Sequence, residues 1–240
     1  TSLIFDPPDG RIPPRTTAGE RIMAQREEQA RLRGGRFDAV ENNQLSDRCI
    51  IMGGAGPPMM NMVYNSNYQI VQSRDYVMFL IEMIHDARII PLDGREQADA
   101  NVRQWMGTSR GHWEGDTLVV ETANFNGKNP IRGSTENMIV TERFTRVDDE
   151  TIVYRFTIDD ASMWTRPWSA ELPMKKTIGP LFEHACHEGN YGMVNLLHAG
   201  RNDEGQALTL AALVSQQRKD AGHPGVREPA VPFAPIQEQP

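Results

Sequence analysis

The sequence predicts a mainly β protein, an antiparallel up-and-down barrel of eight strands with an N-terminal helix and C-terminal helices. Between residues 68 and 177, apolar and polar residues alternate with a period of two, which is typical of half-buried strands. Short polar turns such as EGD and DDE separate these segments, and such turns connect antiparallel neighbours. Because no helix-length segment interrupts the second half, we expect closure into a barrel, which removes free strand edges.

Residues 1–47 are expected to form an arm and a helix before the barrel. The prolines of the first 16 residues predict an extended arm that lies across the surface. A helix is predicted from Thr17, which can act as N-cap with Glu20 three residues later, and the helix should stop at Gly34 and Gly35. Few of its residues are apolar, so we expect it to pack by a narrow stripe and stay mostly solvated.

The barrel domain is predicted over residues 48–201, followed by a C-terminal helix over 202–220 and a loosely held, proline-rich tail over 221–240. A short amphipathic helix is expected at 192–201 and a longer one at 204–220. The eight expected strands are 68–72, 76–83, 87–92, 110–115, 117–125, 138–147, 151–159 and 168–177.

Three charged residues fall in the inward, apolar phase of their strands: Glu82, Arg88 and Glu142. Glu82 shares its phase with Tyr76 and Leu80. An unpaired buried charge costs several kcal/mol, so these groups must pair with one another or meet a ligand. Two interpretations follow: Arg88 pairs internally with one of the two glutamates, or the same network lines a pocket. Both hold if the pair forms a pocket wall.

The stretch RGHWEGDTLVVETANF places unusual residues around a buried strand. If Trp113 faces the core together with Leu118 and Val120, then His112 and Glu114 point away from the core. They would lie on the barrel wall or, if the barrel curls at its mouth, at the rim. A lone histidine such as His112 carries little functional specificity.

Acid/base chemistry is suggested by His85 beside Asp86 and by His187 beside Glu188, because a carboxylate can orient an imidazole that titrates near neutral pH. The predicted catalytic residues are Glu82, His85, Asp86, Glu142 and His187. Trp164 and Trp168 could stack on an aromatic ligand or pack at a barrel end. The predicted substrate-binding residues are Arg88, His112, Trp113, Tyr154, Trp164, Trp168 and Tyr191.

No metal or cofactor is expected. His184, Cys186 and His187 stand together, but their spacing is not that of common zinc sites. Phosphate-binding glycine loops, a serine-hydrolase elbow and a zincin helix motif are absent from the sequence. The two cysteines, Cys49 and Cys186, could form a disulfide in an oxidising compartment or remain two buried thiols in a reducing one.

The composition of the chain limits the kinds of partner that it is expected to bind. With 25 Lys plus Arg against 32 Asp plus Glu, the net charge of -7 opposes binding of nucleic acid. No window approaches the roughly 18 apolar residues of a membrane-spanning helix. The chain begins at Thr1 without an apolar signal core, as expected after removal of a signal peptide, although a chain trimmed at its start would look the same. Nothing in the sequence predicts an oligomeric state.

Several strings resemble those of a large family of secreted bacterial proteins. They are HDARIIPLDGR, SRGHWEGDTLVVET, ERFTRVDDETIVYRFTIDD, WTRPWSAELPM and HACHEGNYG, within residues 48–201. The resemblance implies a periplasmic or secreted location and no particular reaction. GHWEG also resembles the G-x-W motif of lipocalin-type barrels, although it lies in mid-chain rather than on the first strand.

These observations predict a periplasmic or secreted, lipocalin-like barrel that holds a small, partly apolar, aromatic or anionic organic molecule. We expect it to catalyse a cofactor-free acid/base reaction such as elimination, isomerisation or hydration, as a lyase or isomerase does. Arg88 would hold an anionic group of the substrate. One alternative is a binding or carrier protein of the same fold. Another is an envelope interaction protein, in which the three buried charges are mutually paired with no cavity beside them.

Overall fold

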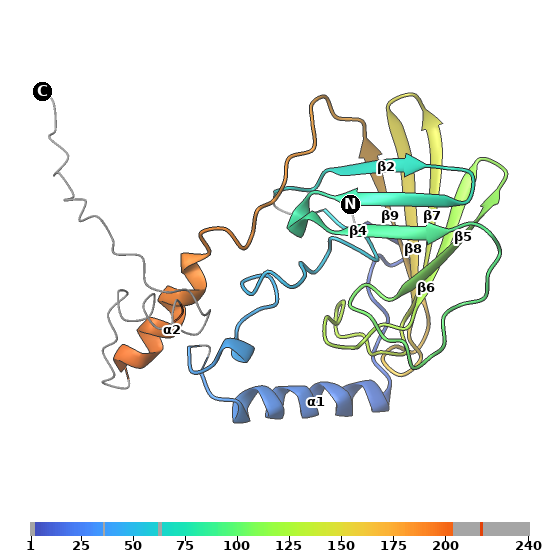
Figure 1. Ribbon diagram of the computed structural model, residues 1–240. Helices are drawn as coiled ribbons and strands as arrows, with labels where there is room; N and C mark the ends of the chain where they lie inside the picture. Colours follow the sequence, from blue (N-terminus) through green and yellow to red (C-terminus); the bar gives the residue numbers. More distant parts are fainter. Residues whose placement is uncertain (1–2, 36, 62–63, 204–216, 218–240) are drawn as a thin grey trace, which may run out of the picture.

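The computed structural model describes residues 3–35, 37–61, 64–203 and 217, and it shows two antiparallel β-sheets packed face to face (Figure 1). The larger sheet has six strands in the order β1-β9-β8-β7-β6-β5, and the smaller sheet has three in the order β2-β3-β4. In Figure 1 the strands of the smaller sheet run across those of the larger one, as in orthogonal sheet packing. The strands are β1 (Ile4–Asp6), β2 (Tyr68–Gln72), β3 (Tyr76–Ile81), β4 (Ala87–Pro91), β5 (Thr108–Glu114), β6 (Thr117–Ala123), β7 (Ile139–Asp148), β8 (Thr151–Asp159) and β9 (Trp168–Lys175).

All eight predicted strands are present, as β2 to β9, but the predicted barrel closure is wrong: the described residues form no closed barrel. Closure would require hydrogen bonding across the free edges of both sheets. The outer edge of β9 is already occupied by β1, where Ile4 pairs with Ala170 and Asp6 with Ser169. The predicted surface arm therefore contributes a ninth strand, which covers an edge that the barrel would have closed.

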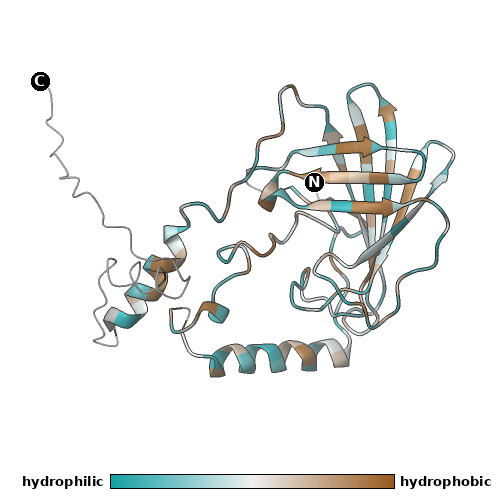
Figure 2. Cartoon of the chain, in the orientation of Figure 1, coloured by the Kyte–Doolittle hydropathy of each residue, from teal (hydrophilic) through white to brown (hydrophobic). Residues whose placement is uncertain are grey.

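The core lies between the two sheets. Phe79 of β3 packs on Phe144 of β7 with ring centroids 4.9 Å apart, and Phe144 stacks on Tyr154 of β8 at 4.8 Å. Tyr154, Phe156 and Ile158 form a row of buried side chains on one face of β8. Figure 2 shows apolar stretches in both sheets and a mostly polar α1. Burial of each large apolar side chain contributes about 1.5–3 kcal/mol, so this layer holds the sheets together.

The N-terminal helix α1 (Thr17–Leu32) is confirmed, but it begins one residue earlier than predicted. Thr16, not Thr17, is the N-cap: its hydroxyl accepts a hydrogen bond from the Gly19 amide at 2.9 Å and donates to the Ser162 carbonyl at 3.0 Å. Gly19 is the buried residue of α1, and a Cβ there would lie 2.4 Å from the Met163 carbonyl oxygen. The cap therefore also anchors an otherwise solvated helix to the loop after β8.

A disulfide joins Cys49 and Cys186, with 5.7 Å between the Cα atoms, which confirms the paired alternative. It fastens the segment after β9 to the segment before β2. Asn190 adds a hydrogen bond from its side-chain amide to the Asp47 carbonyl at 2.9 Å. The disulfide is consistent with an oxidising, extracytoplasmic location.

Helix α2 (Tyr191–Asp203) confirms the short helix predicted at 192–201. Short 3₁₀ turns occur at η1 (Val40–Asn42) and η2 (Met83–His85). The helix predicted at 204–220 and the tail at 221–240 lie outside the described residues, apart from residue 217. Among the described residues, no helix is long and apolar enough to cross a membrane.

Candidate functional site

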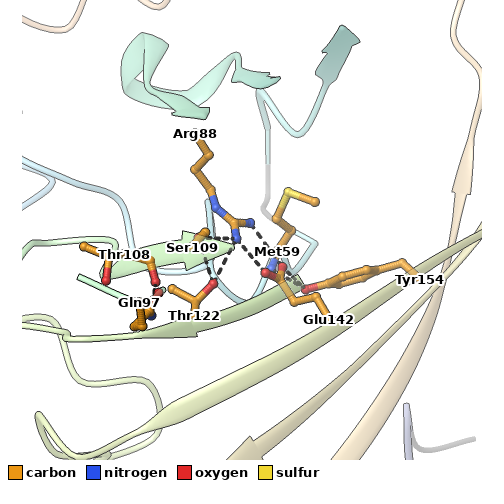
Figure 3. Close-up of polar contacts among 8 residues, drawn as sticks. All are labelled: Met59, Arg88, Gln97, Thr108, Ser109, Thr122, Glu142 and Tyr154. Carbon is orange, nitrogen blue, oxygen red and sulfur yellow. Dashed lines mark hydrogen bonds and ion pairs between the residues drawn. The ribbon is translucent and has the colours of Figure 1, made fainter. Parts of the chain in front are cut away.

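A bidentate ion pair joins the two sheets at the centre of the molecule (Figure 3). Arg88 on β4 donates from Nη1 to Glu142 Oε1 at 3.1 Å and from Nη2 to Oε2 at 2.6 Å. Glu142 lies on β7, and its strand neighbours on the same face are Val120 of β6 and Phe156 of β8. Both charged side chains are almost fully buried. The predicted internal pair is therefore present, and Glu142 is the partner of Arg88.

Neighbouring side chains use most of the remaining hydrogen-bonding capacity of this pair. Tyr154 donates from its hydroxyl to Glu142 Oε1 at 2.8 Å and accepts from the Met59 amide at 2.9 Å. Arg88 Nη2 also lies 3.3 Å from the Ser109 hydroxyl and 3.4 Å from that of Thr122. Figure 3 shows these side chains converging on the guanidinium and carboxylate groups. The result is a nearly satisfied polar network inside an apolar core.

The electrostatics of the network keep Arg88 charged and Tyr154 protonated. Burial lowers the pKa of Arg88, but the charge of Glu142 and the hydrogen bonds to it outweigh this effect and leave the pKa raised. Burial raises the pKa of the Tyr154 phenol well above its usual value, and the Glu142 charge raises it further. In this network Glu142 is therefore held between two strong donors.

Glu82 stands apart from this network. It was expected in the row of Tyr76 and Leu80, but the buried row of β3 is Val77, Phe79 and Ile81. Glu82 is 5% exposed because the chain leaves the extended conformation there, with φ -60° and ψ -44°. The turn brings its carboxylate back toward the start of β2.

The partner of Glu82 is Asn67, the residue before β2. Glu82 Oε2 accepts from the Asn67 side-chain amide at 2.7 Å and from the Asn67 backbone amide at 3.3 Å. The Glu82 amide in turn donates to the Asn67 carbonyl at 3.0 Å. The two residues thus extend the β2–β3 pairing by one position.

A first cleft of about 970 Å³ lies where the smaller sheet meets the ends of β8 and β9 and the segment that follows β9. Glu82 and Tyr68 supply polar groups inside it, and burial raises the pKa of Tyr68 to about 12. Its other charged residues are exposed: Arg146, Asp148, Asp149, Glu150, Lys175 and Lys176. Its apolar lining includes Met59, Met60, Ile70, Leu80, Ile152, Leu172, Met174, Leu181 and Phe182.

A second cleft of about 770 Å³ borders β4 and the segment between β4 and β5. Arg88 and Ser109 reach its wall, and Asp86 lies at its edge, where burial raises the pKa of that carboxyl. Arg88 Nε is buried and has no hydrogen-bond partner among the described residues. The central ion pair therefore lies beside a cavity. This agrees with the sequence-based expectation that Arg88 is paired and that the pair forms part of a pocket wall.

The predicted histidines do not converge on either network. His85 is exposed, and among the described residues no hydrogen bond joins it to Asp86. His187 is also exposed, on the segment held by the disulfide. His112 lies on the outer face and reaches Glu114 at 3.2 Å. The predicted catalytic residues thus occupy three separate regions: Glu142 is in the ion pair, Glu82, His85 and Asp86 are in the β3–β4 connection, and His187 is in the segment after β9.

The polar residues of the RGHWEG stretch lie on the outer face of the larger sheet and make polar contacts there. Glu114 bonds Arg143 at 2.6 Å as well as His112, and this carboxylate therefore has a lowered pKa. The expectation that Trp113 is a core residue is wrong. It lies opposite Leu118 at the end of the β5–β6 hairpin, where the smaller sheet does not cover it, and it is 45% exposed.

The other predicted binding residues have different environments. Trp164 and Trp168 are each 3% exposed and pack edge to face with centroids 5.8 Å apart, as expected for packing at the end of a core. Tyr191 is 65% exposed at the start of α2, and Tyr154 is inside the ion-pair network. Of the predicted site residues, Glu82 lines the first cleft, and Arg88 and Asp86 line the second.

Metal binding by the HACH segment has little support. Cys186 is in the disulfide, His187 is exposed, and the ring of His184 lies 6.3 Å from that of Tyr64. Within the described ranges, no group of three or more His, Cys, Asp or Glu side chains is placed to hold a metal ion.

Of the residues that line the first cleft, the sequence predicted only Glu82, and it missed the two polar neighbours Asn67 and Tyr68. The register of the β2–β3 hairpin contains a usable signal: pairing Gln72 with Val77 and counting back places Asn67 opposite Glu82. Met59 carried no such signal, because it belongs to an irregular segment before β2.

Comparisons of the chain with models of protein families, with curated proteins and with solved structures found no match. The resemblance of its strings to a family of secreted bacterial proteins therefore stays a prediction.

Proposed function

We propose that this chain is a periplasmic or secreted protein that binds a small, partly apolar organic molecule in the first cleft. The observation that carries the proposal is the lining of this 970 Å³ cleft, in which apolar side chains lie beside the buried Glu82 and the half-buried Tyr68. Ligand sites have volumes of roughly 300–1,000 Å³, mostly apolar walls and a few placed polar groups. The cleft has a volume in this range, and it combines an apolar part with the polar groups of Glu82 and Tyr68.

The contacts of the central ion pair favour a binding protein over an enzyme that uses Glu142 as a catalytic base. Glu142 makes contacts with Arg88 and Tyr154, so both carboxylate oxygens already have donors. A general base must be free to accept a proton from a bound substrate. We infer that the pair fixes the two sheets and thereby shapes the clefts on either side of it. An envelope interaction protein was expected to lack such cavities.

A cofactor-free acid/base reaction is a second candidate, and one observation favours it. Glu82 and the protonated phenol of Tyr68 line the same cleft, so a carboxylate and a proton donor are available to one bound molecule. Such a pair suits elimination, isomerisation or hydration. Here Glu82, rather than Glu142 or a histidine, is the base. Loss of product formation in Glu82→Gln with retained ligand binding would support it, and unchanged turnover would contradict it.

A thermal-shift screen of the full chain tests the binding proposal. The probes are small phenols, terpenoids, amines and organic acids, each with and without a chelator. Saturable stabilisation by one chemical class, unchanged by the chelator, is the expected result, since a ligand that binds only the folded state raises the melting temperature. Product analysis after incubation with the best ligand separates a carrier from an enzyme. Absence of any shift across the screen would contradict the proposal.

A further inference from the structure

Two glutamates are buried in the described part of the chain, and they differ in their charge balance. Glu142 faces the guanidinium of Arg88, whereas no Lys, Arg or His among the described residues forms an ion pair with Glu82. Among the described residues, the donors that reach the Glu82 carboxylate are the two amide groups of Asn67, both on Oε2. Within the described part of the chain, no donor reaches Glu82 Oε1. Glu82 therefore has no cationic partner in the described part of the chain, and a cation that enters the cleft can compensate its charge.

A third buried carboxylate shows how the fold satisfies such a group when it serves structure alone. Asp160 accepts from the Thr135 amide at 2.6 Å on one oxygen, and from the Thr135 hydroxyl and the Ser162 amide on the other. Both of its oxygens therefore have donors, and it lines neither cleft. Glu82 differs in both respects, because one oxygen lacks a donor and the residue is on a cleft wall.

The cations nearest in the cleft lining are engaged elsewhere. Lys175 donates to the Thr151 hydroxyl at 2.6 Å, and Lys176 pairs with Glu150 at 3.2 Å. Arg146 pairs with Asp149 at 3.0 Å. The Arg146–Asp149 and Lys176–Glu150 pairs lie on the exposed rim, and among the described residues none of the three cations forms an ion pair with Glu82.

We propose that the first cleft binds a protonated primary or secondary amine with an apolar body, anchored by Glu82. This inference rests on the proposed binding function. The ammonium group donates to Glu82 Oε1 and compensates its charge, and charge-assisted bonds of this kind are the stronger hydrogen bonds of proteins. The aromatic ring of Tyr68 is available for a cation–π contact, and the methionine and leucine side chains of the lining contact the apolar body. An anionic ligand of equal size is repelled.

Three probes with one aromatic body and different head groups test the proposal: 2-phenylethylamine, 2-phenylethanol and 3-phenylpropanoate. Their affinities for the full, non-reduced chain are measured by calorimetric titration at neutral pH. The amine is expected to bind at least about 10-fold more tightly than the alcohol, as one charge-assisted hydrogen bond provides, and the carboxylate is expected to bind most weakly. This comparison needs no variant, so it holds even if a substitution prevents folding.

Two variants, each of which removes one negative charge, show which carboxylate binds the amine. Glu82→Gln should weaken amine binding about 10-fold or more and leave alcohol binding unchanged. Glu150→Gln, which removes the same charge from the exposed rim of the same cleft, should change amine binding by less than about twofold because solvent screens it. If alcohol and amine bind equally, or the carboxylate binds best, the anchor role of Glu82 is overturned while cleft binding stands. If none of the three binds, the amine proposal is overturned, and the thermal-shift screen decides separately whether the cleft binds another class of molecule.

Discussion

Arg88 of the smaller sheet and Glu142 of the larger sheet are joined by two parallel hydrogen bonds of 3.1 and 2.6 Å in a fully buried setting. This is the one ion pair in the described residues with both partners buried. It links β4 to β7 across the core, and Tyr154 and Met59 extend it toward the first cleft. Arg88 lines the second cleft, and Met59 lines the first.

Removal of one partner should destabilise the fold strongly. Glu142→Gln leaves the Arg88 guanidinium buried without a counter-charge, so the free energy of unfolding should fall by about 3–5 kcal/mol in urea unfolding. Glu171→Gln breaks the exposed Arg155–Glu171 pair and should cost less than about 1 kcal/mol. The double variant Arg88→Met, Glu142→Gln should recover part of the loss, because neither charge remains buried. Equal stability of Glu142→Gln and wild type would contradict the structural role of the pair.

Tyr68 should make stability fall at alkaline pH. Burial raises its pKa from about 10 in the unfolded chain to about 12 in the folded protein. A raised pKa means that the unfolded state loses its proton first, so this contribution is complete below pH 10 and is lost between about pH 10 and 12. In Tyr68→Phe the decline of the unfolding free energy over this window should be smaller. A decline identical to that of wild type would refute the burial of this phenol.

Loss of the disulfide should destabilise the protein and release the segment after β9. The Cys49→Ser, Cys186→Ser variant should lose about 2–4 kcal/mol, since the bond closes a loop of 137 residues. Limited proteolysis should then cut within residues 176–190, where cleavage of the wild type is slow. In the non-reduced, denatured wild type no thiol should react with Ellman-type reagents; two reactive thiols would show that the bond is absent.

The start of α1 offers a pair of adjacent, chemically identical residues. Thr16→Ala should cost about 1 kcal/mol because it removes the N-cap and the bond to the Ser162 carbonyl. Thr17→Ala should be nearly neutral, since alanine favours the first turn of a helix and Thr17 is not the cap. Thermal unfolding of both variants distinguishes them, and a larger loss at Thr17 would mean that the helix begins where the sequence motif suggested.

Local patterns in this sequence predict the strands but not how the sheets end. Alternation identified β2 to β9 because each strand has one face on the core. The barrel was a plausible closure because it removes edges, yet the three-residue strand at Ile4–Asp6 covers β9 instead. Such a short pairing has no periodicity of its own, and its partner is more than 160 positions away, so only tertiary structure reveals it.

The same limit applies to the site. Glu142 was found because its phase with Val140 and Phe144 persists along a regular strand. Glu82 was found for the wrong reason: it is buried because the backbone turns after Ile81, not because it continues the strand. Alternation also says nothing of contacts from irregular segments, and for that reason Met59 and the extent of the first cleft could not be predicted.

The measurement that tests the central claim most directly compares two variants with the same substitution. Met174 lines the first cleft on β9, and Met78 is equally half-buried on β3 outside it. Calorimetric titration with the best ligand of the screen should show binding to wild type and Met78→Trp, and at least about 10-fold weaker binding to Met174→Trp, whose indole fills the cleft. Equal affinity for all three proteins would contradict the first cleft as the binding site.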